Sequence, residues 1–303
     1  MDDTVSMSAV PPLIHENIPL APFSSMKVGG LARYYFAPQS LVDLKWGLSW
    51  AETRQQNIFV LGNGSNIVFS DWGFNGLIIH LTKSLSNIQW NNNIVIVEAG
   101  AKLSTLTRQS LHRGLSGIQR LIGIPGTVGG GTYINAGAFQ QELGQSIIKV
   151  ISYTPEGDKK ERNREQCCFG YRHSVFCDVF EIIVEVHINL CQSTCSLVKT
   201  ESKEILEKRK VKQPLNFPSA GSMFKRPKNN YAGTLIEKAG LKGLQIGGAQ
   251  VSEKHANFII NIGNAKAQDI YNLKQKVINE VAEKFGVMLE NEVRFIGKFT
   301  SQD

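Results

Sequence analysis

Residues 124–138 read IPGTVGGGTYINAGA, and five of these fifteen residues are glycine. A glycine in a regular element costs roughly 0.5–1 kcal/mol of stability relative to alanine, because its unfolded backbone has more freedom to lose. Bare backbone also lets another group approach closely, and successive N–H groups in tight turns form concave sites that hold anions. The stretch therefore indicates a place where a ligand lies directly against the main chain.

A second glycine-rich segment, GNGSN at residues 62–66, follows the apolar strand predicted at Ile58–Leu61. The dinucleotide fingerprint of doubly wound folds requires a third glycine where Ile67 stands, and a P-loop requires a Gly-Lys-Ser/Thr triplet that the chain lacks. Either segment alone could be a sharp turn. Two of them in one region favour phosphate binding through some other architecture.

Length and composition indicate a globular protein of two or three domains, with 303 residues of which 42% are hydrophobic. No apolar run reaches the roughly 18–20 residues of a membrane helix, and the N-terminus lacks the pattern of a secretory signal. We therefore expect a cytoplasmic protein that does not enter the membrane, with a flexible tail over residues 1–17.

The charge pattern favours a small anionic ligand over nucleic acid. The formal net charge is +7, but the densest basic segment, Lys203–Lys212, is interrupted by two glutamates at helical spacing. That spacing is typical of a solvated helix face, and basic residues are not interleaved with aromatic ones as in single-strand binders. The five cysteines, all between Cys167 and Cys195, form no C-x-x-C pair. We expect buried or half-buried free thiols and no metal site.

Hydrophobic periodicity predicts mixed α and β structure throughout. The predicted helices cover residues 41–56, 103–113, 197–211 and a last one that includes 270–285, and the predicted strands cover 58–61, 76–81, 94–98, 150–153, 182–190, 257–262 and 292–299. Pro155–Gly157 predicts a hairpin between the strand at 150–153 and a strand starting at Lys159. Pro214 and Pro218 interrupt the pattern, which indicates a domain boundary there.

Three polar stretches could carry chemistry: YRHS at Tyr171–Ser174, AGSMFKRP at Ala220–Pro227 and ENEVRFIG at Glu290–Gly297. Each also has a plain structural interpretation, as a surface ion pair, a turn and a strand end respectively. Chemistry requires the three stretches to converge in space, and their spacing along the chain does not establish that.

Taken together and in order, the motifs resemble the UDP-N-acetylenolpyruvoylglucosamine reductase (UDP-N-acetylmuramate dehydrogenase) family over about residues 23–297. The segments that carry the resemblance are VGGLARY, GNGSN, GLSGIQRLIGIPGTVGG, NAGA, YRHS, KQPL, PSAGSMFKRP, IEKAGLKG, SEKHANFIIN and LENEVRFIG. The compact segment 242–257 resembles the shorter, type II form, which lacks a substrate-capping insertion.

The resemblance implies an α+β fold, with a vanillyl-alcohol-oxidase-type FAD-binding lobe of two α+β subdomains followed by a smaller α+β substrate-binding domain. The implied boundaries are 18–82 and 83–196 for the subdomains and 197–303 for the second domain. FAD would be bound non-covalently. The residues expected to contact it are Gly62, Asn63, Gly64, Ser65, Asn66, Ile124, Pro125, Gly126, Thr127, Gly129, Gly130, Asn135, Ala136 and Gly137.

The implied reaction is a two-stage hydride transfer, in which NADPH reduces FAD and the flavin then reduces UDP-N-acetylglucosamine-enolpyruvate. By motif, Arg172 and Glu292 would stabilise the enolate that forms, and Ser222 would donate the proton. The residues expected on the substrate side are Tyr171, Lys212, Lys225, His255 and Asn257. We expect a monomer. The alternatives are a related FAD-linked oxidase or dehydrogenase with another substrate, and a nucleotide-binding module without catalysis.

Overall fold

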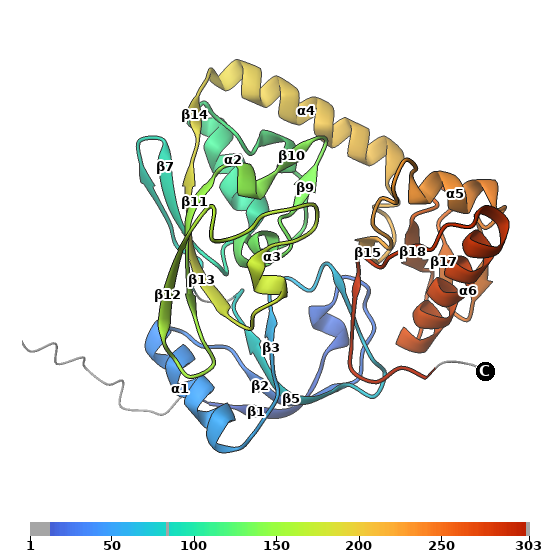
Figure 1. The fold of residues 1–303 in the computed structure, drawn as a ribbon, viewed down its shortest axis with the longest axis horizontal. Coiled ribbons are helices and arrows are strands. Elements are labelled where there is room, and N and C mark those ends of the chain that lie inside the picture. The colour runs from blue at the N-terminus through green and yellow to red at the C-terminus, as the bar shows by residue number, and fades with distance from the viewer. Residues whose placement is uncertain (1–12, 83–84, 301–303) are drawn as a thin grey trace, which may run out of the picture.

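The computed structural model describes residues 13–82 and 85–300, which form a larger N-terminal lobe and a smaller C-terminal lobe (Figure 1). No helix in these ranges is long and apolar enough to cross a membrane. The first sheet of the larger lobe has the order β1 (His15–Pro19), β2 (Leu31–Phe36), β5 (Phe74–His80), β3 (Ile58–Leu61). Strands β1 and β2 are antiparallel, whereas β2, β5 and β3 are parallel. The parallel strands place the loop after β3 at the sheet edge, where a ligand can reach it.

Helix α1 (Leu41–Thr53) packs beside the first sheet because its apolar positions recur at helical spacing. Ser40 caps the helix by accepting a hydrogen bond from the Asp43 N–H, and Leu44 and Leu48 are buried. Gly47 allows the Phe36 ring to approach, since a Cβ at that position would lie 2.4 Å from a ring carbon.

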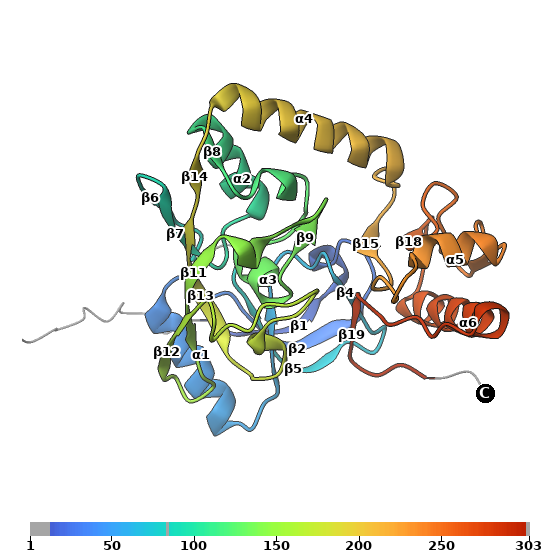
Figure 2. The ribbon, with the colours of Figure 1, turned by 45° about the horizontal axis from the view of Figure 1, so that its top comes forward.

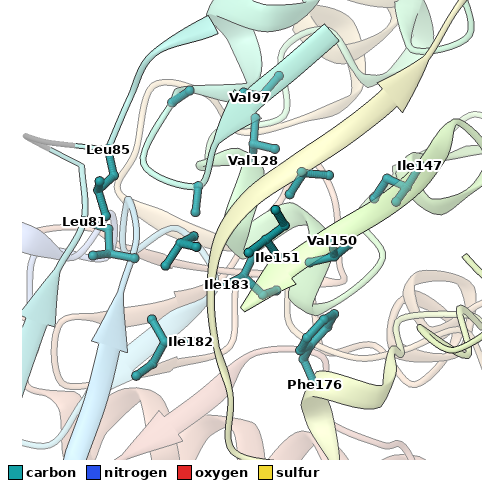
Figure 3. Packing of buried hydrophobic residues seen from close by; sticks show 14 of the residues in the cluster. Leu81, Leu85, Val97, Val128, Ile147, Val150, Ile151, Phe176, Ile182 and Ile183 are labelled. Atoms are coloured by element: carbon teal, nitrogen blue, oxygen red, sulfur yellow. The ribbon is translucent and has the colours of Figure 1, made fainter. Parts of the chain in front are cut away.

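The second sheet of the larger lobe is antiparallel throughout, in the order β12 (Lys159–Asn163), β11 (Ile147–Tyr153), β13 (Ile182–Asn189), β7 (Ile94–Glu98), β6 (Ile88–Asn91). Alternating apolar residues of these strands bury one face, where Val97, Val150 and Ile183 pack with the short helix α3 (Val128–Tyr133) through Val128 (Figure 3). The remaining elements of this lobe are α2 (Leu103–His112), β4 (Ile67–Phe69), β8 (Leu115–Ser116), β9 (Gly137–Ala138), β10 (Gln141–Glu142) and β14 (Cys191–Gln192).

Helix α4 (Cys195–Lys212) crosses from the larger lobe to the smaller one (Figures 1 and 2). The smaller lobe has an antiparallel sheet in the order β15 (Ser219–Ser222), β18 (Phe258–Asn261), β17 (Ala249–Val251), β16 (Gln245–Ile246), with helices α5 (Ala232–Lys238) and α6 (Ala267–Phe285). Gly286 ends α6 in the left-handed conformation, with φ 65°.

The four predicted helices and the hairpin at Pro155–Gly157 are confirmed within a few residues, and the last strand is confirmed but shorter than predicted. Only Arg294–Ile296 form a strand, β19, and it pairs in parallel with β4 of the larger lobe. The chain therefore returns to the first lobe after building the second. The paired strands are more than two hundred residues apart in the sequence, so local periodicity does not predict their pairing.

Three further expectations need correction. The tail expected over 1–17 is ordered from His15, because β1 pairs with β2; residues 1–12 lie outside the described ranges. Only Cys167 is buried, whereas the other four cysteines are exposed; all five are free thiols. Helix α4 begins before residue 197 and packs on the larger lobe, where Glu201 pairs with Arg120. By packing, the smaller lobe therefore begins nearer residue 213.

Candidate functional site

The two glycine-rich segments meet and form one wall of a cavity of about 880 Å³. The Ser65 hydroxyl donates a hydrogen bond to the Pro125 carbonyl over 2.6 Å. A Cβ on Gly62 would lie 2.6 Å from Thr127 Oγ1, so the glycine leaves room for the Thr127 side chain to approach. Segments sixty residues apart in the sequence thus form a single surface, as their composition suggested.

The loop at residues 62–66 has the properties of an anion-binding turn. Gly64 is left-handed, with φ 62°, and a Cβ there would lie within bonding distance of the Phe23 carbonyl oxygen. The N–H groups of Asn63, Gly64 and Ser65 donate no hydrogen bond to any residue in the described ranges. Free N–H groups in a tight turn are what a diphosphate requires, and the cavity has the size of a cofactor site. The residues present therefore fit FAD.

Every residue predicted to contact FAD lines this cavity except Asn135. Asn135 is buried, and its side-chain amide donates to Glu142 Oε2 and the Gly170 carbonyl and accepts from the Gly144 N–H, at 2.8–2.9 Å. These three bonds use the amide to hold neighbouring loops together. Asn135 does not line the cavity, and a cofactor contact there stays a prediction, because an asparagine in a glycine-rich segment can serve either purpose.

Arg172 and Glu292 come together although 120 residues separate them. Arg172 Nε lies 2.5 Å from Glu292 Oε1, and Arg172 Nη2 donates to the Gly137 carbonyl over 3.0 Å. Arg172 itself has a φ of 54°, a conformation that non-glycine residues rarely adopt and that often marks functional sites. Burial raises the pKa of Glu292, and the Arg172 guanidinium lowers it by less.

Ser222 lies at the end of β15, half-buried, on a wall that the first cavity shares with a second cavity of about 560 Å³. Arg172 and Glu292 line both cavities as well. The three predicted catalytic residues, which come from two loops and a strand, therefore converge where the two cavities meet. Their plain structural interpretations do not explain this convergence.

The smaller cavity is lined by long polar side chains, among them the predicted substrate residues Tyr171, Lys212, His255 and Asn257. Burial lowers the pKa of His255, which favours the neutral imidazole. Asn257 is buried, and its amide donates to the Phe224 carbonyl and accepts from the Phe224 N–H. Its side chain therefore fixes the strand beside Ser222, and a single amide hydrogen remains for a ligand.

Lys225 is not among the residues that line either cavity. Its Nζ lies 3.5 Å from Glu290 Oε2 and its side chain is 37% exposed, so the structure gives no support to a substrate contact there. The sequence analysis instead missed two cations of the smaller cavity, Arg226 and Lys254. Arg226 follows Lys225 directly, and the cation-rich motif gave no sign of which of the two faces the ligand.

The larger cavity also contains a residue that the sequence analysis missed, Arg209 of α4. It is 7% exposed, and neither Nε nor Nη2 has a hydrogen-bond partner among the residues that the structure describes. It belongs to the segment Lys203–Lys212, which was predicted to be a solvated helix face. That prediction is wrong at Arg209, because the helix turns this position toward the cavity.

Comparisons with known proteins place these features in a family. Residues 213–296 match the model of the UDP-N-acetylenolpyruvoylglucosamine reductase C-terminal domain, and residues 32–158 match that of an FAD binding domain. A UDP-N-acetylenolpyruvoylglucosamine reductase of Pediococcus pentosaceus is 37% identical over 98% of this chain and 99% of its own. The chain belongs to the UDP-N-acetylenolpyruvoylglucosamine reductase family.

Other relatives agree with this assignment. The reductase of Caldicellulosiruptor bescii is 42% identical over 93% of this chain and 90% of its own. The crystal structure of UDP-N-acetylenolpyruvylglucosamine reductase from Thermus caldophilus superposes with a TM-score of 0.81 at 30% identity, over 94% of this chain and 100% of that one. The chain is thus an FAD-dependent oxidoreductase, with an FAD-binding lobe and an α+β fold.

Proposed function

We propose that the chain reduces the enolpyruvyl ether of UDP-N-acetylglucosamine-enolpyruvate to UDP-N-acetylmuramate, a step of bacterial peptidoglycan synthesis, with FAD as cofactor and NADPH as hydride donor. The observation that carries the proposal is the convergence of Arg172, Ser222 and Glu292 on the wall between the two cavities. When bound, FAD supplies the hydride chemistry, taking a hydride from NADPH and passing it to the enolpyruvyl carbon.

Arg172 and Glu292 would stabilise the negative charge that develops on the pyruvyl group. A preorganised guanidinium in a partly buried site does this without reorganisation, and the Gly137 carbonyl and Glu292 hold that of Arg172 in place. Because burial raises the pKa of Glu292, its carboxyl can carry a proton and donate a hydrogen bond to the same oxygen.

Ser222 would donate the proton to the carbon next to the one that receives the hydride. A hydroxyl is a weak acid in water, so this role requires a basic carbanion acceptor and polarising neighbours. Arg172 and Glu292, which line the same wall, supply the polar surroundings. Ser222 is therefore needed only when the substrate is reduced and not when NADPH delivers its hydride.

The smaller cavity would hold the UDP-sugar. Its cations Lys212, Arg226 and Lys254 suit a diphosphate, and the Arg226 N–H donates to the Tyr171 hydroxyl, which fixes that ring beside Arg172. This assignment replaces Lys225 with Arg226 among the expected substrate contacts. Strands β16 and β17 follow each other closely within 242–257, which supports the shorter form of the family.

The remaining assignments follow from the proposed reaction. We expect a cytoplasmic monomer that binds no nucleic acid, because NADPH and UDP-sugars are cytoplasmic metabolites and one chain supplies every proposed catalytic side chain. Residues 18 to about 212, divided near 82, would bind FAD, and the residues from about 213 would bind substrate, in place of the boundary expected at 196. Sedimentation of the purified enzyme checks the monomer.

Anaerobic half-reactions test the proposed function. NADPH should bleach the flavin absorbance of the purified protein, and UDP-N-acetylglucosamine-enolpyruvate should then restore it with formation of UDP-N-acetylmuramate. UDP-N-acetylglucosamine without the enolpyruvyl group is the matched control and should leave the flavin reduced. If the enolpyruvyl compound also leaves the flavin reduced, another oxidant is the substrate and the proposal fails.

A further inference from the structure

Arg209, near the end of α4, is the only buried arginine among residues 13–82 and 85–300. Its Nε and Nη2 atoms have no hydrogen-bond acceptor in that part of the chain. A buried guanidinium that has lost its hydration without gaining an acceptor strongly destabilises a fold. The position therefore indicates an anionic partner that is not part of the polypeptide.

Other arginines of the larger lobe show that the fold can supply such partners. Three of them form ion pairs at 2.5 Å: Arg120–Glu201, Arg162–Glu181 and Arg172–Glu292. The side chains of these three arginines are 39%, 25% and 19% exposed, so each needs a partner less than Arg209 does. The most buried guanidinium is thus left without a carboxylate.

The side chain of Arg209 faces the larger cavity. A Cβ on Gly123 would lie 3.0 Å from Arg209 Cδ and 3.4 Å from Nε, so the glycine leaves room for the side chain. Arg209 Cζ lies 5.5 Å from the centroid of the Phe139 ring, which also lines the cavity. Burial lowers the pKa of Arg209 to about 10, so the guanidinium keeps its charge at neutral pH.

The contacts of Arg209 place it toward the catalytic end of this cavity. Phe139 lies two residues after Gly137, whose carbonyl accepts a hydrogen bond from Arg172. Gln213, one helical turn after Arg209, lines the cavity too. The redox-active ring of FAD must lie beside Ser222 and Arg172 for hydride transfer, whereas the free N–H groups of the 62–66 loop suit the diphosphate.

We propose that Arg209 supplies the counter-charge for the edge of the isoalloxazine ring that becomes negative when FAD is reduced, and so raises the reduction potential of the bound cofactor. A hydride brings two electrons and one proton, which leaves one negative charge on the ring. A fixed cation at this edge stabilises the reduced ring more than the neutral oxidised one. The inference rests on the proposed function for the position of the ring beside Ser222 and Arg172, whereas its test uses FAD alone and needs no enolpyruvyl substrate.

The test measures the reduction potential of bound FAD against a reference dye under anaerobic conditions, and the affinity of the apoprotein for oxidised FAD. In Arg209→Met and Arg209→Gln the reduction potential of bound FAD should become more negative. The expected shift corresponds to a loss of affinity for reduced FAD that is about tenfold greater than the loss for oxidised FAD. Arg209→Lys should recover part of the shift. Arg113→Met is the matched control, because Arg113 also stacks on an aromatic ring, that of Trp90, but lies outside both cavities. The reduction potential of FAD bound to this variant should not change.

Two results would overturn the assignment. Equal weakening of oxidised and reduced FAD, with an unchanged potential, would place the FAD diphosphate on Arg209 instead of the ring. An unchanged potential and unchanged affinity would make Arg209 a purely structural residue. Thermal unfolding of each apoprotein shows whether the variant is folded. If Arg209→Met does not bind FAD, a comparison of Arg209→Gln with Arg209→Lys still measures the effect of the positive charge. Failure of the enolpyruvyl compound to reoxidise the enzyme would leave these measurements unaffected.

Discussion

The two cavities differ in the parts of the chain that line them. One wall of the larger one is formed by the glycine turns of residues 62–66 and 123–130, and the N–H groups of residues 63–65 are free there among the described residues. The smaller one is lined by long side chains that include Tyr171, Lys212, Arg226 and His255. A site made of main chain can be recognised from the glycine content of a short stretch of sequence. The smaller cavity cannot be recognised in this way, because its residues are scattered between 171 and 292. The catalytic side chains lie where the two meet.

The largest effect should come from Ser222, because it acts in only one of the two half-reactions. In Ser222→Ala we expect reoxidation of the reduced flavin by substrate to slow about 10²–10⁴-fold, the usual contribution of a general acid. Bleaching by NADPH should be nearly unchanged, and stopped-flow absorbance measures both steps. Equal slowing of the two half-reactions would remove Ser222 from the role of proton donor.

The main-chain wall is tested at Gly64. Gly64→Ala places a Cβ against the Phe23 carbonyl and should weaken FAD binding to the apoprotein about 100-fold, or ~2.7 kcal/mol. Gly157→Ala is the matched control, since Gly157 is also left-handed, with φ 89°, but has open space around it. This variant should lose only roughly 1 kcal/mol of stability, which is the cost of the backbone strain of a left-handed alanine. Its affinity for FAD should not change. Similar FAD affinities in the two variants would contradict a main-chain site.

The shared wall is tested through pH. Because burial raises the pKa of Glu292, a step that needs its protonated form should be fast below that pKa and slow as pH rises through it. Glu292→Gln keeps a hydrogen-bond donor that cannot ionise. The variant should therefore reoxidise about tenfold more slowly at low pH, and the decline at high pH should disappear. A decline that persists in the variant would assign it to another group.

The smallest effects should distinguish two lysines that the sequence analysis treated alike. Lys212→Met removes a cation from the smaller cavity and should raise the KM for the UDP-sugar about tenfold. Lys225→Met removes a lysine that faces Glu290 outside both cavities, and KM should stay within about twofold. Steady-state kinetics at fixed NADPH measures both, and a larger effect at Lys225 would show that the cavity is wrongly assigned.

The sequence analysis was most successful where local signals decide. Glycine turns, the hairpin at Pro155–Gly157 and the last helix, α6, have local signals, and the structure agrees with them. The three catalytic residues were expected because the motifs resemble those of a family, and their spacing alone did not bring them together. The site they form is visible only once the smaller lobe packs against the larger one.

Several features escaped prediction because they depend on tertiary packing. Arg209 lies in a helix whose charge pattern is that of a solvent-exposed helix, and only the packing around Gly123 buries it. Asn135 has a polar amide that a ligand or a loop could use, and its partners Gly144 and Gly170 follow it by 9 and 35 residues. The last strand pairs with β4 across the lobes. No local pattern encodes these partners.

A crystal structure of the protein with FAD and the enolpyruvyl substrate would test the central claim most directly. We expect the flavin in the larger cavity, the UDP group in the smaller one, and the enolpyruvyl group between Arg172, Ser222 and Glu292. Ser222→Ala should allow the reduced complex to be trapped. Both ligands lying in a single cavity, or an enolpyruvyl group out of reach of Ser222, would contradict the account.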